Sequence, residues 1–173
     1  MKQEVASFLD YVAHSPTVFQ ATQQACDMLD AAGFTRLSEH EAWEILPGGR
    51  YYVTRNRSAL VAFAVPENGF THCQIVASHG DSPTFKLKAH AEGEAAGAYI
   101  RLDVEPYGGM IMSTWFDRPL SIAGRALVRE DGRLVTRLID LDRDAALIPN
   151  MPIHFNRDIN SGYSYNPQTD MLP

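Results

Sequence analysis

The residues best suited to chemistry lie in the run VASHGDSPTFKLK, residues 76–88. His79 follows a short apolar stretch there, and Asp81 stands two residues further on. Layered α/β proteins bind ligands beyond the carboxyl ends of strands, so a histidine in this place could hold a metal ion. A metal-bound imidazole needs an acceptor for its second nitrogen, and a nearby carboxylate fills that role. The same residues also suit a surface loop in which Asp81 caps a turn and His79 is solvated.

Two other clusters could bind a ligand. Residues 107–125 combine paired glycines with the run WFDR at 115–118, a set that suits a structural corner between strands as well as a binding site. The run PIHFNRD at 152–158 contains His154, which could be a metal ligand, a substrate contact or a core histidine. The sequence has no P-loop, GxSxG, HExxH or CxxC motif, so these common nucleotide, nucleophile and metal sites are not predicted.

The composition indicates a globular protein. The 173 residues are 45% hydrophobic, and 15 basic against 21 acidic residues give a net charge of −6, which disfavours nucleic acid as a partner. No stretch approaches the roughly 20 apolar residues of a membrane span, and the N-terminus lacks the apolar core of a signal peptide. We therefore expect a cytoplasmic protein. Cys26 and Cys73 form no disulfide framework and are predicted to be buried, inert thiols.

Two helices are predicted at the start of the chain. Apolar residues recur at helical spacing over residues 3–14 and again up to residue 32. Ser15 followed by Pro16 reads as the N-cap and first position of the second helix. Gly33 supplies the left-handed residue that ends it.

Strands are predicted after the helices. Residues 51–54 and 59–65 form a strand pair across residues 56–58, and the run ALVAFAV is apolar on both faces, so we expect it to be covered on both sides. A second buried strand, Gln74–Ser78, is expected to lead to His79. Residues 1–82 therefore have the pattern of a layered α/β structure.

The pattern changes after Pro83. Apolar and polar residues alternate over three further stretches, which is typical of half-buried strands in an antiparallel sheet. Residues 130–133 are predicted to form a hairpin turn. We place a boundary in the small, polar segment 90–97. The final residues are polar and turn-like, so we expect a truncated chain.

Three long motifs occur together in one order: SHGDSPTFKLK, EPYGGMIMSTWFDRPLSIAGR and PIHFNRDIN. In this combination they resemble the M18 metallo-aminopeptidases, the aspartyl aminopeptidase family, and the likeness runs along the whole chain. The resemblance implies an α/β fold in which two N-terminal helices and a mixed sheet, residues 1–90, open a zinc-exopeptidase catalytic domain. Residues 91–173 would then be part of a β-rich antiparallel insert that serves dimerisation.

The resemblance also implies a reaction. Family members use two Zn²⁺ ions to hydrolyse the peptide bond after an N-terminal residue, usually Asp or Glu. His79 matches the family's first zinc ligand, and Asp81 matches the catalytic-site acid that orients it. His154 matches a histidine of the insert that contacts substrate in the partner subunit's active site. The expected partners are peptides with an acidic N-terminus and further copies of the chain, with neither nucleic acid nor membrane.

Family members are longer than this sequence. The resemblance places the general base and the remaining zinc ligands beyond Pro173, and one histidine cannot hold two zinc ions that each need about four ligands. The chain is therefore expected to be the N-terminal segment of the enzyme, inactive alone and without stoichiometric zinc. The alternative is a non-catalytic module that serves oligomerisation or assembly.

Overall fold

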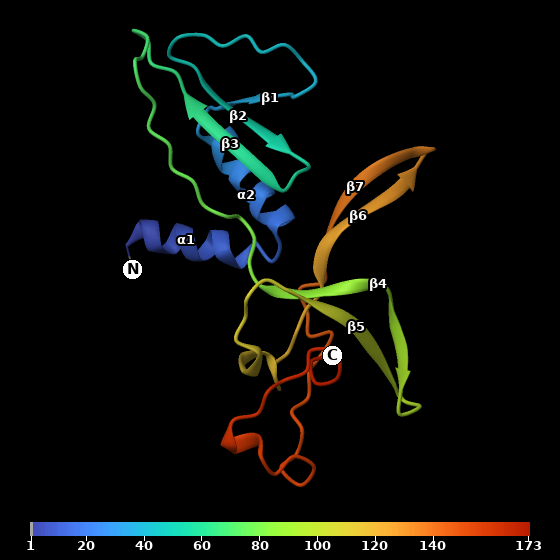
Figure 1. Ribbon diagram of the computed structural model, residues 1–173. Coiled ribbons are helices and arrows are strands. Elements are labelled where there is room, and N and C mark those ends of the chain that lie inside the picture. The colour runs from blue at the N-terminus through green and yellow to red at the C-terminus, as the bar shows by residue number, and fades with distance from the viewer. Residues whose placement is uncertain (1) are drawn as a thin grey trace. The chain divides into compact units, whose positions relative to one another are not determined.

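The computed structural model describes residues 2–173, which form two compact units (Figure 1). The first unit comprises residues 2–81 and Ala123–Asp140, and the second comprises Ser82–Ile122 and Leu141–Pro173. Two helices, a small mixed sheet and two antiparallel hairpins confirm the predicted α/β class.

Both predicted helices are present as α1, Gln3–Ala13, and α2, Val18–Ala31. The predicted cap of α2 is wrong, because Thr17 and not Ser15 is the N-cap: its side chain accepts a hydrogen bond from the Phe19 N–H at 3.2 Å. Thr17 has the extended backbone that an N-cap requires.

Ser15 belongs instead to the end of α1. Its backbone N–H donates to the Val12 carbonyl at 3.1 Å, so it completes the preceding helical turn. At the other end of α2, Gly33 has φ +79° and its N–H donates to the Asp30 carbonyl at 3.0 Å, as predicted for a glycine that ends a helix.

The sheet of the first unit has the order β1-β2-β3. β1, Thr35–Leu37, runs parallel to β2, Arg50–Arg55, which pairs antiparallel with β3, Ala59–Ala64. The predicted hairpin between the last two strands is confirmed, and Asn56 and Arg57 form its turn with φ of +52° and +54°.

The core of the first unit lies between α2 and β2. Tyr51 and Tyr52 of β2 are buried, and so are Ala21 and Cys26 of α2. β3 lies at the edge of this sheet, and the side chain of Val61 is 61% exposed. The prediction that β3 is covered on both faces is therefore wrong for the described residues, because the Val61 side chain stays mostly exposed on one of those faces.

The second predicted buried strand, Gln74–Ser78, is also absent. No helix or strand lies between Ala64 and Thr84, and Val76 is 95% exposed. A strand needs a neighbour to bond its backbone, and none of the described residues takes that place. Cys73 lies in the same segment and is exposed, which corrects its predicted burial, whereas Cys26 is buried as predicted.

A hairpin from later in the chain belongs to the first unit. β6, Ala123–Glu130, pairs antiparallel with β7, Arg133–Asp140. The predicted turn is confirmed, with Asp131 and Gly132 at φ of +48° and +78°. The hairpin is bonded to α2 through the buried side chain of Gln20.

The second unit is built on the hairpin of β4, Thr84–Ala95, and β5, Tyr99–Tyr107. A register shift between Leu87 and Glu92 interrupts the pairing, as a β-bulge does. The remainder is mostly irregular and carries two short 3₁₀ turns, at Met112–Trp115 and Ile159–Ser161. Its most deeply buried side chains are Val104, Ile148 and Met171.

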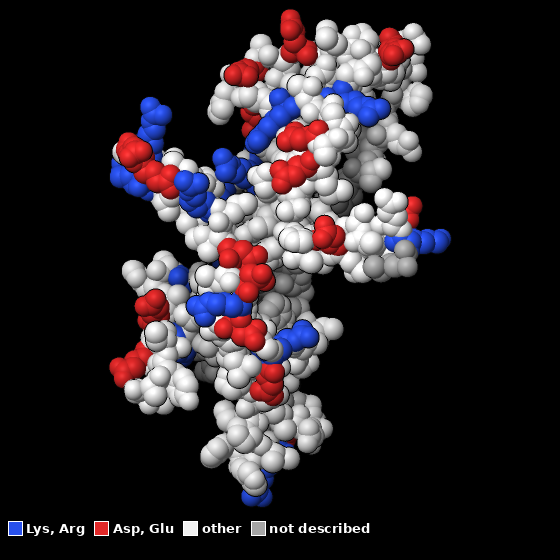
Figure 2. Space-filling model, turned by 180° about the vertical axis from the view of Figure 1, so that it is seen from behind, with Lys and Arg blue, Asp and Glu red and all other residues white. Residues whose placement is uncertain are grey.

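The predicted boundary segment 90–97 contains the end of β4 and the turn to β5, whereas the compact units change at Asp81. The division into a catalytic domain at 1–90 and an insert at 91–173 stays a prediction. Acidic and basic side chains are interspersed on the face shown in Figure 2. No helix among residues 2–173 is both long and apolar enough to cross a membrane.

Candidate metal-ligand site

The candidate site lies in the extended segment that leaves β3 and reaches β4 (Figure 1, green). A Cβ built on Gly80 would be 3.8 Å from the Val18 Cγ2 atom, so this segment passes close to the first residue of α2. His79 and Asp81, on either side of Gly80, are therefore presented at the start of that helix within the first unit.

His79 and Asp81 are brought together by the structure. The Nδ1 atom of His79 lies 2.7 Å from the backbone carbonyl oxygen of Asp81 and 3.2 Å from its carboxylate Oδ1 atom. Both partners are acceptors, so Nδ1 carries the proton and the lone pair is on Nε2. This is the tautomer that a histidine ligand uses when its second nitrogen is held by a carbonyl or carboxylate.

Exposure also suits a ligand. The His79 side chain is 81% exposed, so Nε2 is accessible and the ring is not packed in an apolar interior. The Nε2 atom of this imidazole can therefore serve as one zinc ligand while Asp81 holds the other ring nitrogen. Within residues 2–173, no group of three or more His, Cys, Asp or Glu side chains is placed to hold a metal ion. The described residues therefore fit one ligand of such a site and not a complete coordination shell.

His154 is exposed in the second unit, in a turn where the Phe155 N–H donates to the Pro152 carbonyl at 2.8 Å. This exposure excludes the interpretation of His154 as a core histidine. Its interpretation as a substrate contact stays a prediction.

The WFDR run has a structural function in the second unit. The Asp117 carboxylate accepts hydrogen bonds from the backbone N–H of Asn150 at 2.9 Å and from its side-chain amide at 3.1 Å. The Asp117 N–H donates to the Ile148 carbonyl at 2.9 Å. Asp117 therefore holds two loop segments together, which favours the structural-corner interpretation. Its φ of +54° is one that aspartate adopts more readily than most residues.

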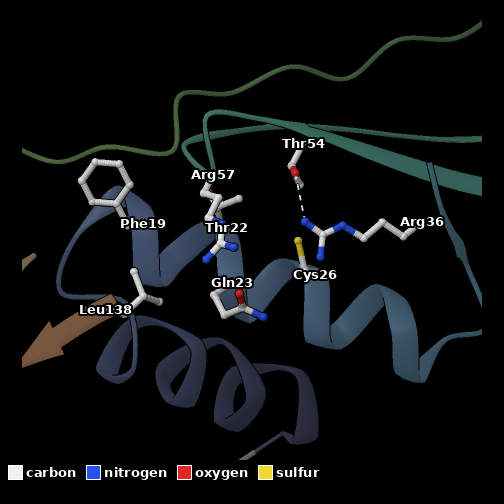
Figure 3. A pocket seen from close by; sticks show the side chains of 8 residues that line it. All are labelled: Phe19, Thr22, Gln23, Cys26, Arg36, Thr54, Arg57 and Leu138. Atoms are coloured by element: carbon white, nitrogen blue, oxygen red, sulfur yellow. Dashed lines mark hydrogen bonds between the residues drawn. The ribbon is translucent and has the colours of Figure 1, made fainter. Parts of the chain in front are cut away.

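A small cleft that was not predicted from the sequence lies beside α2 (Figure 3). Its lining includes neither His79 nor Asp81, and its volume of about 10 Å³ gives room for about one water molecule. The Arg36 guanidinium donates there to the Thr54 hydroxyl at 3.3 Å. The residues that line the cleft are Phe19, Thr22, Gln23, Cys26, Arg36, Thr54, Arg57 and Leu138.

Two ionisable groups near this cleft are shifted toward their neutral forms. Burial raises the pKa of the Cys26 thiol, which makes it a poor nucleophile. Burial and the hydrogen bond to Asp30 raise the pKa of Tyr52 to about 12. The Tyr52 hydroxyl donates to the Asp30 Oδ1 atom at 2.7 Å. Both side chains are buried in the core of the first unit.

Comparison with known proteins relates the chain to one family. Residues 11–173 match the family model described as aminopeptidase I zinc metalloprotease (M18). A probable M18 family aminopeptidase 2 from Clostridium acetobutylicum is 43% identical over 183 residues, which cover 100% of this chain and 42% of that protein. The chain thus spans about two-fifths of the length of this curated relative.

Solved structures show the same likeness. The cryo-EM structure of the Ape4 and Nbr1 complex contains a chain that is 41% identical, with a TM-score of 0.91 over 97% of this chain and 33% of that one. The S. cerevesiae mApe1 dodecamer is 30% identical, with a TM-score of 0.77 over 86% of this chain and 36% of that one.

Proposed function

This chain belongs to the M18 family of zinc metallopeptidases, and we propose that it forms the N-terminal part of a zinc-dependent aminopeptidase. The family match covers nearly the whole chain, whereas the chain covers less than half of its relative. The activity is therefore proposed for the complete enzyme, and the 173-residue chain alone is proposed to be inactive.

The observation that carries this proposal is the pairing of the His79 Nδ1 atom with Asp81. It leaves Nε2 as the one ring atom able to bind a metal ion. We assign His79 as a zinc ligand and Asp81 as the residue that orients it. When bound, a zinc ion supplies a Lewis acid that polarises the substrate carbonyl and activates water. The described residues contribute one fixed imidazole to that site.

The substrate is proposed to be a peptide with an N-terminal Asp or Glu, by resemblance to the aspartyl aminopeptidases. His154 is proposed to contact this substrate, and its exposure supports a role in contact with another molecule. We also propose that the complete enzyme is cytoplasmic.

Oligomerisation is the second proposed property. A similar solved structure is a dodecamer, which supports assembly of this protein into homo-oligomers. We propose that the predicted insert, residues 91–173, provides the contact between copies. An assembly module without catalysis remains the alternative function.

Peptide hydrolysis by a complete single-chain enzyme distinguishes the aminopeptidase from the assembly module. We would join residues 1–173 to the part of the Clostridium acetobutylicum relative that this chain does not match, and measure release of N-terminal Asp, Glu, Leu and Lys. Release of Asp and Glu that a chelator abolishes and zinc restores supports the proposal. Soluble oligomers that release none of the four residues would contradict it and favour the assembly module.

A further inference from the structure

The cleft beside α2 is lined by two arginines that no carboxylate neutralises. Arg36 lies in β1 and Arg57 in the turn between β2 and β3, and both guanidinium groups lie over α2 (Figure 3). Among residues 2–173 neither side chain forms an ion pair, and the hydrogen bond that they make is the one from Arg36 to Thr54. Two positive charges on one cleft repel each other, so the cleft favours a negatively charged ligand.

Two carboxylates of α2 lie near the cleft but have neutral partners. Asp27 and Asp30 both raise the pKa of the cysteine thiol that lines the cleft. Asp27 accepts a hydrogen bond from the Gln23 amide at 2.8 Å, and Asp30 accepts one from the Tyr52 hydroxyl at 2.7 Å. Neither carboxylate lies within ion-pair distance of either arginine, so both guanidinium charges stay available to another molecule.

Hydroxyl groups add further donors to the lining. Thr22 is only 9% exposed and lines the cleft, yet its hydroxyl bonds to no other described residue. Buried hydroxyls are normally paired, and a threonine within a helix can use the carbonyl three or four residues earlier. The Thr54 hydroxyl accepts from Arg36, which leaves its own hydrogen to donate. The cleft therefore offers O–H as well as N–H donors.

The turn that carries Arg57 is held in place. The Arg125 guanidinium donates to the Asn56 carbonyl at 2.6 Å and to the Asn56 side-chain oxygen at 3.0 Å. Arg125 also lies over the Phe19 ring of α2, with its Cζ atom 4.2 Å from the ring centroid. These contacts attach the turn to α2 within the first unit, so the backbone of Arg57 needs no reordering when a ligand binds.

We propose that this cleft binds a phosphate group. Its volume of about 10 Å³ admits one oxygen atom, and the rest of the group lies at the mouth, where both arginines are exposed. Arg36 and Arg57 donate to the phosphate oxygens, and Thr22 donates to the oxygen that enters the cleft. A phosphate group carries a charge of about −1.5 to −2 at pH 7, which balances two arginines, whereas one carboxylate balances only one.

This site is separate from the candidate metal ligand. Neither His79 nor Asp81 lines the cleft, so phosphate binding there does not require zinc. The remainder of a phosphate ester would stay in solvent at the mouth, so free phosphate and a phosphate monoester share the chemistry that the cleft recognises.

The test is calorimetric titration of residues 1–173 with inorganic phosphate, at an ionic strength held constant with sodium acetate. We expect a Kd below about 1 mM. Arg57→Gln should weaken binding by about tenfold or more, because it removes one charge and its hydrogen bonds. Arg133→Gln is the matched control, since Arg133 is exposed in the same unit and does not line the cleft; it should change the affinity by less than about twofold.

Thr22→Val distinguishes a specific site from general attraction to positive charge. It removes the hydroxyl and keeps the branched shape, and it should weaken phosphate binding by about fivefold or more. Without phosphate, the urea midpoint of this variant should be unchanged or higher, because the hydroxyl bonds to no described residue. Phosphate affinity equal to that of the unsubstituted chain would overturn the proposal.

Titration with glycerol 3-phosphate distinguishes the two sources of the group. Binding at least as tight as that of inorganic phosphate assigns the cleft to phosphate monoesters, and weaker binding assigns it to free phosphate. The proposal fails if neither compound binds at concentrations up to about 10 mM. It also fails if Arg57→Gln and Arg133→Gln lose affinity equally, because binding would then follow the net charge and not the cleft.

Discussion

The side-chain amide of Gln20 donates a hydrogen bond to the backbone carbonyl of Ile139 at 2.9 Å, across 119 positions of sequence. Gln20 is buried, and its amide nitrogen also lies 3.4 Å from the Gly124 carbonyl oxygen. Its carbonyl oxygen accepts from the Thr17 hydroxyl, so one side chain joins the start of α2 to both strands of the β6–β7 hairpin.

Gln20→Ala should lower the free energy of unfolding by about 1 kcal/mol, because it removes a buried amide donor that bonds backbone carbonyl groups of the hairpin. Urea denaturation followed by circular dichroism measures this change. Gln23→Ala is the control on the same helix, since Gln23 is exposed and its side-chain amide donates to the Asp27 carboxylate. A loss from Gln20→Ala no larger than that from Gln23→Ala would show that the hairpin is not held by this side chain.

Thr17→Ala should destabilise the protein by about 1 kcal/mol, because it removes the cap of the first free N–H groups of α2. Ser15→Ala should cost less, since the Ser15 hydroxyl is buried without a hydrogen-bond partner among the described residues. Thermal unfolding of both variants compares the two positions. Equal losses, or a larger loss at Ser15, would contradict the assignment of Thr17 as the cap.

Stability should fall at high pH through Tyr52. Its pKa is about 12 in the folded chain against about 10 for an exposed tyrosine, so the neutral hydroxyl is the form that the fold stabilises. That stabilisation is complete below pH 10 and is lost as the pH rises through 12. Tyr52→Phe should cost about 1 kcal/mol at pH 8 and flatten the decline above pH 10. Urea midpoints from pH 8 to 11.5 measure this, and parallel curves for both proteins would contradict the prediction.

Asp81→Asn should weaken zinc binding by the complete enzyme by about tenfold, the low end of the range for a residue that orients a metal ligand. The reason is geometric: the His79 Nδ1 atom also donates to the Asp81 backbone carbonyl, which the substitution retains. Competition with a fluorescent zinc chelator measures the affinity. A loss of more than about a thousandfold would imply that Asp81 itself binds the metal.

The sequence predicted correctly those elements that depend on residues close together in the chain. Helical periodicity identified α1 and α2, and Gly33 and the 130–133 turn were predicted from backbone preferences that neighbouring residues alone fix. The cap of α2 was misassigned because Ser15-Pro16 and Thr17 both fit the capping pattern. The structure decides between them, because the Phe19 N–H bonds the Thr17 side chain while the Ser15 N–H bonds back to Val12.

Non-local features could not be predicted in the same way. The burial predicted for the apolar runs at 59–65 and 74–78 is wrong for the described residues, because burial of a strand depends on neighbours from distant parts of a chain, which a local apolar pattern does not specify. The His79–Asp81 pair was predicted from spacing and family resemblance, whereas the carbonyl of Asp81 as the nearer acceptor emerged only from the backbone conformation. The bond from Gln20 to Ile139 left no signal in the sequence.

The zinc content of the complete single-chain enzyme, measured per subunit beside its rate of hydrolysis, tests the role of His79 most directly. His79→Gln should lose at least one zinc ion per subunit and about a hundredfold or more in turnover. His14→Gln should retain both the zinc and the turnover, since His14 lies at the end of α1 and its ring contacts Asp10 of the same helix. Full zinc content with unchanged turnover in His79→Gln would contradict the assignment of His79 as a metal ligand.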